Sequence, residues 1–370
     1  HLQKLGYVIF TTLPHYAGVD MVLSAYLKQT GDNFQSKFER LDTGYGDDIL
    51  KRLSADKSKK PWFHFMYLGD LHMSNVTRTM DIPKRFDSEK FGKNKFERSI
   101  SVIDYWLGKF LEKIDLESTL VIITADHGDY IPINDVRDHH FIPEFTKSVS
   151  IAKNLLPKPL WPLTKKIAKQ IRLKIQEKRF NDATKNFTEL EKRSLRTRAG
   201  WYLFDDLVRT PLLFCGNNTP HDKLINNQVA SVDIFPSILD LLDLPQINED
   251  VDGESFVPLL QNESSSSNPI YLETASIEMD DVLGKMVGIR TSEYKYFRSR
   301  KSSKEKIHLY DLKNDPLEEN NLAKINLELV KQMESILSNF LITFDDNASE
   351  KLSDEEAKIV ENELKRLGYM

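Results

Sequence analysis

The sequence predicts an α/β fold with a central, mostly parallel sheet flanked by helices, and a smaller antiparallel sheet towards the C-terminus. Two apolar segments, 62–68 and 120–123, are typical of buried strands. A segment with apolar residues at three- and four-residue spacing lies between them, and the order strand, helix, strand favours a parallel crossover. After residue 264, strand-like segments follow one another without intervening helices, which is typical of an antiparallel sheet.

The N-terminal part supplies the expected elements of the main sheet. A short strand is expected at 7–10, a short helix at 46–53 and a stronger strand from Trp62 onwards. The helix after this strand is predicted from its regularly spaced apolar residues, which are Phe96, Ile100, Ile103, Leu107, Phe110 and Ile114.

The C-terminal part begins after a serine run near 264–268, which marks a loop and a domain boundary. We therefore expect a main domain at 1–263, including a strand at 211–214 and a helix at 233–244, and a subdomain at 264–370. The expected elements of the subdomain are strands at 270–273, 286–290, 294–298 and 307–311 and helices at 325–340 and 353–366.

Composition indicates an ordinary globular protein, since 40% of the 370 residues are hydrophobic and 29% are charged. The net charge of −5 gives no general attraction to nucleic acid, so no nucleic-acid partner is expected. A single cysteine, Cys215, excludes internal disulfides. No segment resembles a transmembrane span or a signal peptide, and the sequence leaves a cytoplasmic or exported location open.

The strand at 120–123 runs into Asp126, His127 and Gly128, where side chains leave a rigid platform. A carboxylate oxygen and a neutral imidazole are typical ligands of a divalent cation, and the glycine would let the backbone turn sharply away. The sequence therefore predicts metal ligands at Asp126 and His127. The alternative is a helix-capping aspartate beside a surface histidine.

The strand that begins at Trp62 also ends in polar residues, Asp70 and His72. If both strands belong to one parallel sheet, their carboxyl ends meet at the same edge, and His72 lies near Asp126 and His127. The alternative is that His72 is a loop histidine with a backbone partner.

Residues 147–198 differ from the rest of the chain, with fifteen Lys or Arg against four Asp or Glu. Leu163, Ile167, Ile171 and Ile175 recur every four residues between basic side chains, which predicts a basic amphipathic helix. One interpretation is a solvated insertion packed on the main domain. The other is contact with an anionic polymer or a membrane surface.

A series of segments, taken in order, resembles the sulfatase family of the alkaline phosphatase-like superfamily. The resemblance covers nearly the whole chain apart from 147–198. Its segments are WFHFMYLGDLH (62–72), TLVIITADHGD (119–129), FDDLVRTPLLF (204–214), SVDIFPSILDLL (231–242), GESFVPLL (253–260), GIRTSEYKYFR (288–298), LYDLKNDPLEENNLA (309–323) and LSDEEAKIVENELKRLGY (352–369).

This resemblance implies an alkaline phosphatase-like fold and metal-dependent hydrolysis of sulfate esters of a small molecule or glycan. Asp126 and His127 match two metal ligands of the family. His72 matches a histidine that contacts the bridging oxygen of the ester and assists the leaving group, and Arg198 is the candidate for a further cationic contact. Calcium is the family default for the single divalent metal, with manganese and zinc as alternatives.

Other positions qualify the expected substrate. Commoner sulfatases have Asn where this chain has His127, which instead resembles phosphodiester and phosphonate monoester hydrolases; a phospho-headgroup transferase of the same superfamily is a further alternative.

His139 or His140 matches a histidine that often follows the turn, or else lies in a surface loop. Arg290, Lys295 and the 311–321 segment are interpreted as structural supports of the small sheet.

The family nucleophile, a formylglycine made within a Cys/Ser-x-Pro-x-Arg segment, has no counterpart in the 370 residues, and neither has the family's early Asp pair. Cys215 lies on an expected core strand in different surroundings. We therefore expect a fragment that lacks the N-terminal nucleophile segment and is inactive alone. The alternative of another class is a non-catalytic binding protein on a sulfatase scaffold.

Overall fold

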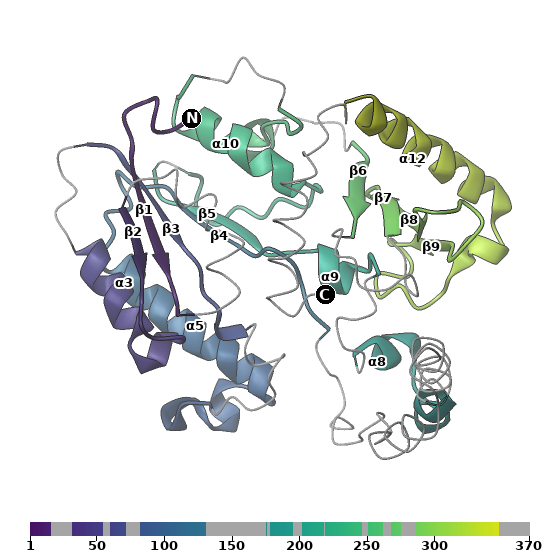
Figure 1. Cartoon of the computed structure of the whole chain (residues 1–370), viewed down its shortest axis with the longest axis horizontal. Coiled ribbons are helices and arrows are strands. Elements are labelled where there is room, and N and C mark those ends of the chain that lie inside the picture. The colour runs from purple at the N-terminus through teal and green to yellow at the C-terminus, as the bar shows by residue number, and fades with distance from the viewer. Residues whose placement is uncertain are drawn as a thin grey trace, which may run out of the picture.

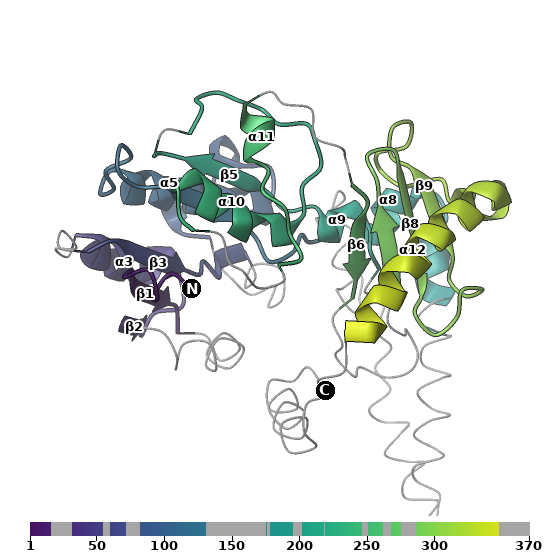
Figure 2. The ribbon, with the colours of Figure 1, turned by 90° about the horizontal axis from the view of Figure 1, so that it is seen from above.

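A computed structural model describes residues 1–15, 32–54, 60–71, 82–130, 175, 178–194, 202–217, 219–245, 251–261, 268–274 and 286–347 of the chain. The strands in these ranges form three sheets, in the orders β2-β1-β3, β4-β5 and β6-β7-β8-β9. Figures 1 and 2 show the first sheet and the last at opposite sides of the molecule, with β4, β5 and helix α10 between them.

The first sheet is parallel, with β1 (Val8–Leu13) between β2 (Asp32–Gln35) and β3 (Trp62–Met66). It confirms the predicted parallel sheet. Helices α3 (Tyr45–Leu53) and α5 (Lys95–Leu111) pack against each other in one apolar cluster, to which Met66 of β3 also belongs. This cluster buries Leu41, Tyr45, Ile49, Leu53, Ile82, Phe86, Val102, Trp106 and Phe110.

The second sheet corrects the predicted crossover. Strand β4 (Val121–Thr124) pairs in antiparallel fashion with β5 (Leu212–Cys215), and in the described part of the chain β3 has its ladder with β1 alone. Strand β4 and the helix before it, α5, were predicted correctly, but the partner strand of β4 lies about ninety residues further along the chain. Local periodicity identifies a strand without selecting its partner, because pairing depends on long-range contacts.

The third sheet confirms the predicted smaller antiparallel sheet. Its strands β6 (Ile270–Glu273), β7 (Met286–Arg290), β8 (Tyr294–Ser299) and β9 (His308–Asp311) pair in sequence order. Side chains alternate between its two faces, as the strand period of two requires. One face packs on α12 (Leu327–Asn347) through residues such as Val287, Tyr296 and Leu309. The other packs on the segment before α9 through Met286, Phe297 and Tyr310.

The remaining elements are short. The helices are α8 (Glu189–Ser194), α9 (Asp205–Val208), α10 (Ile234–Leu241) and α11 (Val257–Leu260). The 3₁₀ turns are η1 (Leu41–Thr43), η2 (Lys84–Phe86), η3 (Glu89–Phe91), η6 (Ser231–Asp233) and η7 (Leu322–Lys324).

Some expectations are not tested by this architecture. Most of the basic 147–198 insertion and the whole of the expected 353–366 helix lie outside the described residues. The domain boundary at 263/264 stays a prediction. Among the described residues, no helix combines the length and the apolar character needed to cross a membrane.

The packing of α12 on the third sheet gives a direct stability test. Leu337 is fully buried in this contact, whereas Ile342, one and a half turns further along α12, is largely exposed. Replacing Leu337 with Ala should lower the free energy of unfolding by about 2–5 kcal/mol, because it removes buried apolar area and leaves a cavity. Urea unfolding followed by circular dichroism measures the loss. Ile342→Ala is the matched control, and an equal loss in both variants would show that α12 does not pack as described.

Candidate metal site and the ion network behind it

The turn after β4 brings the two predicted metal ligands together. The side chain of Asp126 accepts a hydrogen bond from the backbone N–H of His127 through Oδ1, at 3.0 Å. Its other oxygen, Oδ2, lies 3.7 Å from Nε2 of His127. The side chains of Asp126 and His127 are 64% and 34% exposed, so both are partly accessible to solvent.

The imidazole of His127 has a defined tautomer in this arrangement. Its Nδ1 lies 2.6 Å from the backbone oxygen of Gly128, and because a carbonyl oxygen only accepts, Nδ1 carries the proton. Nε2 then keeps its lone pair and faces the Asp126 carboxylate. A backbone carbonyl that orients the far nitrogen is a common support for a metal-binding histidine.

This donor pair fits a divalent cation. A carboxylate oxygen and an imidazole nitrogen 3.7 Å apart are able to bind the same ion, given metal–ligand distances of about 2.0–2.5 Å. The described residues contain no group of three or more His, Cys, Asp or Glu side chains that could hold an ion. Asp126 and His127 would therefore supply part of a coordination shell.

Gly128 joins this turn to helix α9. Its N–H donates a 2.7 Å hydrogen bond to the backbone oxygen of Leu207, and a Cβ on Gly128 would overlap the backbone oxygen of Asp206. Its φ lies outside the left-handed region that favours glycine. The expectation that glycine serves to turn the chain is therefore replaced by another reason: only glycine leaves room for the close approach of α9.

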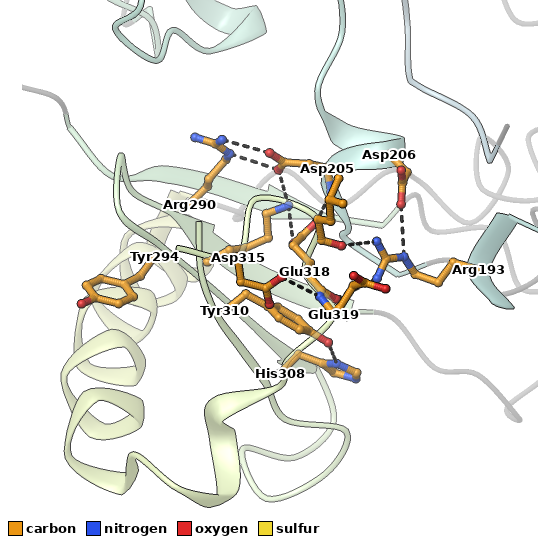
Figure 3. A network of polar contacts seen from close by, with 12 residues as sticks. Arg193, Asp205, Asp206, Arg290, Tyr294, His308, Tyr310, Asp315, Glu318 and Glu319 are labelled. Atoms are coloured by element: carbon orange, nitrogen blue, oxygen red, sulfur yellow. Dashed lines mark hydrogen bonds and ion pairs between the residues drawn. The ribbon is translucent and has the colours of Figure 1, made fainter. Parts of the chain in front are cut away.

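Helix α9 is held by a buried ion network, defined here as Asp205, Arg290, Lys295 and Glu318 (Figure 3). Arg290 forms two hydrogen bonds to the Asp205 carboxylate, from Nε at 3.1 Å and from Nη2 at 3.0 Å. The Lys295 ammonium also pairs with Asp205 and lies 2.9 Å from Oε1 of Glu318. Glu318 in turn accepts a 2.6 Å hydrogen bond from the backbone N–H of Asp205.

The neighbouring acid of α9 has its own partner on α8. Arg193 donates from Nε to Asp206 at 3.1 Å. Its other guanidinium nitrogens donate to the backbone oxygens of Glu318, at 2.8 Å, and Leu317, at 2.6 Å. Both acids of the predicted FDDL segment are therefore engaged in ion pairs, Asp205 with Arg290 and Asp206 with Arg193 (Figure 3).

Electrostatics inside the network depend on Lys295, whose side chain is fully buried. Burial raises the pKa of Asp205, but the hydrogen bonds from Arg290 and the charge of Lys295 outweigh it and hold that pKa at about 2. For Glu318 burial dominates and raises the pKa, despite the opposing effect of Lys295. The two carboxylates around Lys295 are therefore shifted in opposite directions, with the pKa of Asp205 lowered and that of Glu318 raised.

The roles predicted for the site residues stay predictions. Asp126 and His127 lie together, as neighbours in the chain, while His72, Arg198, His139 and His140 are outside the described residues. In the described residues β3 and β4 belong to different sheets, so the argument from one shared sheet edge does not place His72.

Arg290 and Lys295, which the sequence suggested as supports of the small sheet, contact α9 from that sheet. Sequence reasoning missed Asp205 as their partner. The sequence feature that pointed to it was the acidic pair in FDDL, together with the basic residues Arg290 and Lys295 on two strands much further along the chain.

A cavity of about 1010 Å³ lies away from this turn. Its lining includes Leu116, Cys215, His221 and Lys223. Cys215 pairs with Val121 at the beginning of β4, whereas Asp126 follows the other end of that strand. Burial raises the pKa of the Cys215 thiol, which opposes formation of a nucleophilic thiolate and agrees with the expectation that Cys215 is not the nucleophile.

Comparison with protein-family models gives the class of protein. A family model described as Sulfatase matches residues 16–244, more than half of the chain. The chain therefore belongs to the sulfatase family. A second model, described as N-sulphoglucosamine sulphohydrolase, C-terminal, matches residues 199–342, which include the third sheet and most of α12.

Curated relatives are similar over part of the chain. Arylsulfatase K of Gallus gallus is 27% identical over 140 residues, which cover 36% of this chain and 26% of that protein. Arylsulfatase K of Homo sapiens is 26% identical over 146 residues, which cover 37% of this chain and 27% of that protein. The matches thus span about a quarter of the length of these relatives.

Solved structures show the same fold. BT1596, a 2-O GAG sulfatase, superposes with a TM-score of 0.57 at 17% identity over 95% of this chain and 75% of its own. A sulfatase structure from Bacteroides thetaiotaomicron VPI-5482 gives 0.54 at 16% identity, over 85% of this chain and 66% of its own. The predicted alkaline phosphatase-like fold is confirmed.

The ion network predicts a pH-dependent contribution to stability. Because the pKa of Asp205 is lowered in the folded state, its stabilising effect is present above the ordinary value of 3.8 and is lost as the pH falls towards 2. Asp205→Asn should cost about 3–5 kcal/mol of unfolding free energy at pH 6, because Lys295 and Arg290 lose a charged partner. This difference from the wild type should shrink by about 2 kcal/mol between pH 5 and pH 2.5.

Urea unfolding of both proteins across this pH range measures the difference. Groups remote from Asp205 titrate equally in both proteins, so their effects cancel; the Asp205 charge helps to raise the pKa of Glu318, so the titration of Glu318 adds to the measured difference. A difference that stays constant from pH 5 to pH 2.5 would contradict the lowered pKa of Asp205.

Proposed function

We propose that this protein hydrolyses sulfate esters with the help of one divalent cation bound by Asp126 and His127. The observation that carries the proposal is the arrangement after β4, where an open carboxylate oxygen lies 3.7 Å from an imidazole nitrogen with a free lone pair. This turn falls inside the region matched by the Sulfatase family model, and that match supports the reaction class.

Each residue of the turn has a separate role in this proposal. Asp126 supplies a negative oxygen ligand, and His127 supplies Nε2 while its Nδ1–H is fixed by the backbone oxygen of Gly128. When bound, the cation supplies neutralisation of the anionic ester and polarisation of its oxygen. The solvent-open position of both donors leaves room for an ester group beside them.

His72 and Arg198 complete the proposed site on the strength of the family resemblance. His72 follows β3 by a few residues and would donate a proton to the departing alkoxide, a step that histidine performs near neutral pH. Arg198 would contact the sulfate group as a permanent cation.

For the metal we propose calcium first, with manganese and zinc as the alternatives. Calcium prefers oxygen ligands, whereas an imidazole ligand also suits manganese or zinc. Aryl sulfate turnover measured with each ion in turn separates these choices, because affinity alone favours zinc at a site with an imidazole ligand whichever ion supports the reaction.

For the substrate we propose a sulfated small molecule or glycan. Arylsulfatase K and the 2-O GAG sulfatase BT1596 are named for sulfate ester cleavage, which supports this class. The related alternative is a phosphodiester or phosphonate ester, suggested by histidine at position 127. Aryl sulfate, phosphodiester and phosphonate substrates compared side by side would distinguish the two.

The central prediction concerns the turn itself. Asp126→Ala and His127→Ala should each weaken divalent binding at least about 10-fold and lower aryl sulfate turnover by at least about 100-fold, because each removes a direct ligand. Calorimetric titration measures binding, and release of the aryl alcohol measures turnover, using protein expressed from the full open reading frame.

The exposed pair His221 and Asp222 offers a matched control, since it has the same two residue types outside the turn. Both His221→Ala and Asp222→Ala should bind metal as the wild type does. Wild-type metal affinity in Asp126→Ala and His127→Ala would remove these residues from the site. Sulfatase activity without any divalent ion would remove the metal from the proposal.

A further inference from the structure

We propose that the buried ion network of Asp205, Arg290, Lys295 and Glu318 positions the Asp126–His127 turn and thereby sets its affinity for the divalent cation. The inference rests on the proposed function, because it assumes that this turn binds metal. Helix α9 is the connecting element between the network and the turn. In this view Asp205 and Arg290 are positioning residues, which act on the ligands through the backbone.

The first step of the argument is the contact between the turn and α9. Gly128 follows the two ligands directly and donates its N–H to the backbone oxygen of Leu207 at 2.7 Å. There is no space for a Cβ between Gly128 and the backbone oxygen of Asp206. The turn and α9 therefore lie in backbone contact, and a displacement of one displaces the other.

The second step is that α9 depends on outside support. It has only four residues, Asp205–Val208, and isolated helices of this length are unstable in water. Its support comes from the sheet: Asp205 is bound by Arg290 and Lys295, and its N–H by Glu318. Phe204, just before the helix, is buried against the same face of the sheet.

The third step concerns the two faces of the third sheet, which hold different ion pairs. Arg290 and Lys295 are direct cross-strand neighbours on β7 and β8, and both reach α9. Arg298, also on β8, points to the opposite face and binds Glu334 of α12, with Nη2 at 2.7 Å and Nε at 2.9 Å. Among the described residues the two faces of this sheet thus carry separate ion pairs, and those of Asp205 are connected to the metal-ligand turn through α9, whereas Arg298–Glu334 holds α12.

This arrangement gives a specific expectation for metal binding. Replacing Arg290 removes two hydrogen bonds to the largely buried Asp205 carboxylate, which then has Lys295 as its remaining cationic partner, and this loosens α9. The ligand turn then loses its fixed backbone contact, and we expect the dissociation constant for the cation to rise about 10-fold, the lower end of the range for residues that support metal ligands. Loss of the Arg298–Glu334 contact should leave metal affinity unchanged.

The experiment compares Arg290→Gln, Gly128→Ala, Arg298→Gln, Asp126→Ala and the wild type as full-length proteins. Titration calorimetry with calcium and electron paramagnetic resonance with manganese give the dissociation constant of each ion. Urea unfolding of the same proteins shows how much each variant is destabilised. Arg298→Gln is the matched control, because it breaks an Arg–carboxylate pair on the neighbouring strand β8 and so destabilises the same sheet.

The proposal expects weaker binding, about 10-fold, in both Arg290→Gln and Gly128→Ala, with wild-type affinity in Arg298→Gln. If Arg290→Gln does not fold, Gly128→Ala decides, since it pushes the turn away from α9 without removing either ligand side chain. Wild-type affinity in Gly128→Ala, or equal losses in Arg290→Gln and Arg298→Gln, would overturn the positioning role. If binding is lost in Asp126→Ala in that case, the proposed function itself stands; a wild type that binds neither ion overturns both.

Discussion

The C-terminal half of the structure depends on the burial of one ammonium group, that of Lys295. An unpaired charge in a protein interior is very costly, so a fully buried lysine requires carboxylates at close range. Asp205 and Glu318 provide them. Because these acids come from α9 and from the loop after β9, the pairing requirement draws two distant parts of the chain onto β8. A buried ion network of this kind adds little net stability, but it allows few alternative arrangements.

The same requirement links the fold to the candidate site. Asp205 faces the sheet, and the backbone oxygens of Asp206 and Leu207 on the same short helix face Gly128. Arg193 adds a second constraint by joining Asp206 to the backbone after β9. The elements around α9 are thus fixed by charges whose partners lie on the sheet and on α8, and the ligand turn rests on the result.

Features that depend on residues close together in the chain could be predicted from the sequence, whereas contacts between residues far apart in the chain could not. The strands from 286 to 311 were predicted because their alternation is local, and Asp126 and His127 lie together because they are adjacent in the chain. The pairing of β4 with β5, and of Asp205 with Arg290 and Lys295 at separations of 85 and 90 residues, depends on contacts that no local pattern specifies. The resemblance to sulfatases identified the family, but the ion pairs of Asp205 with Arg290 and Lys295 are visible only in the three-dimensional structure.

Gly128 connects the exposed side chains of Asp126 and His127 to the buried contacts that hold their backbone. The side chains of Asp126 and His127 are open to solvent, as a site that admits an ester requires, so packing does little to hold them. An exposed side chain loses rotamer freedom when it binds an ion, and this entropy cost falls when its backbone is already fixed. Fixing the backbone needs a rigid neighbour within hydrogen-bond distance, and residue 128 has room for that neighbour only as glycine. On the proposed assignment, the metal ligands can therefore remain exposed, because the backbone beside them contacts α9, which Lys295 and Asp205 hold in the interior.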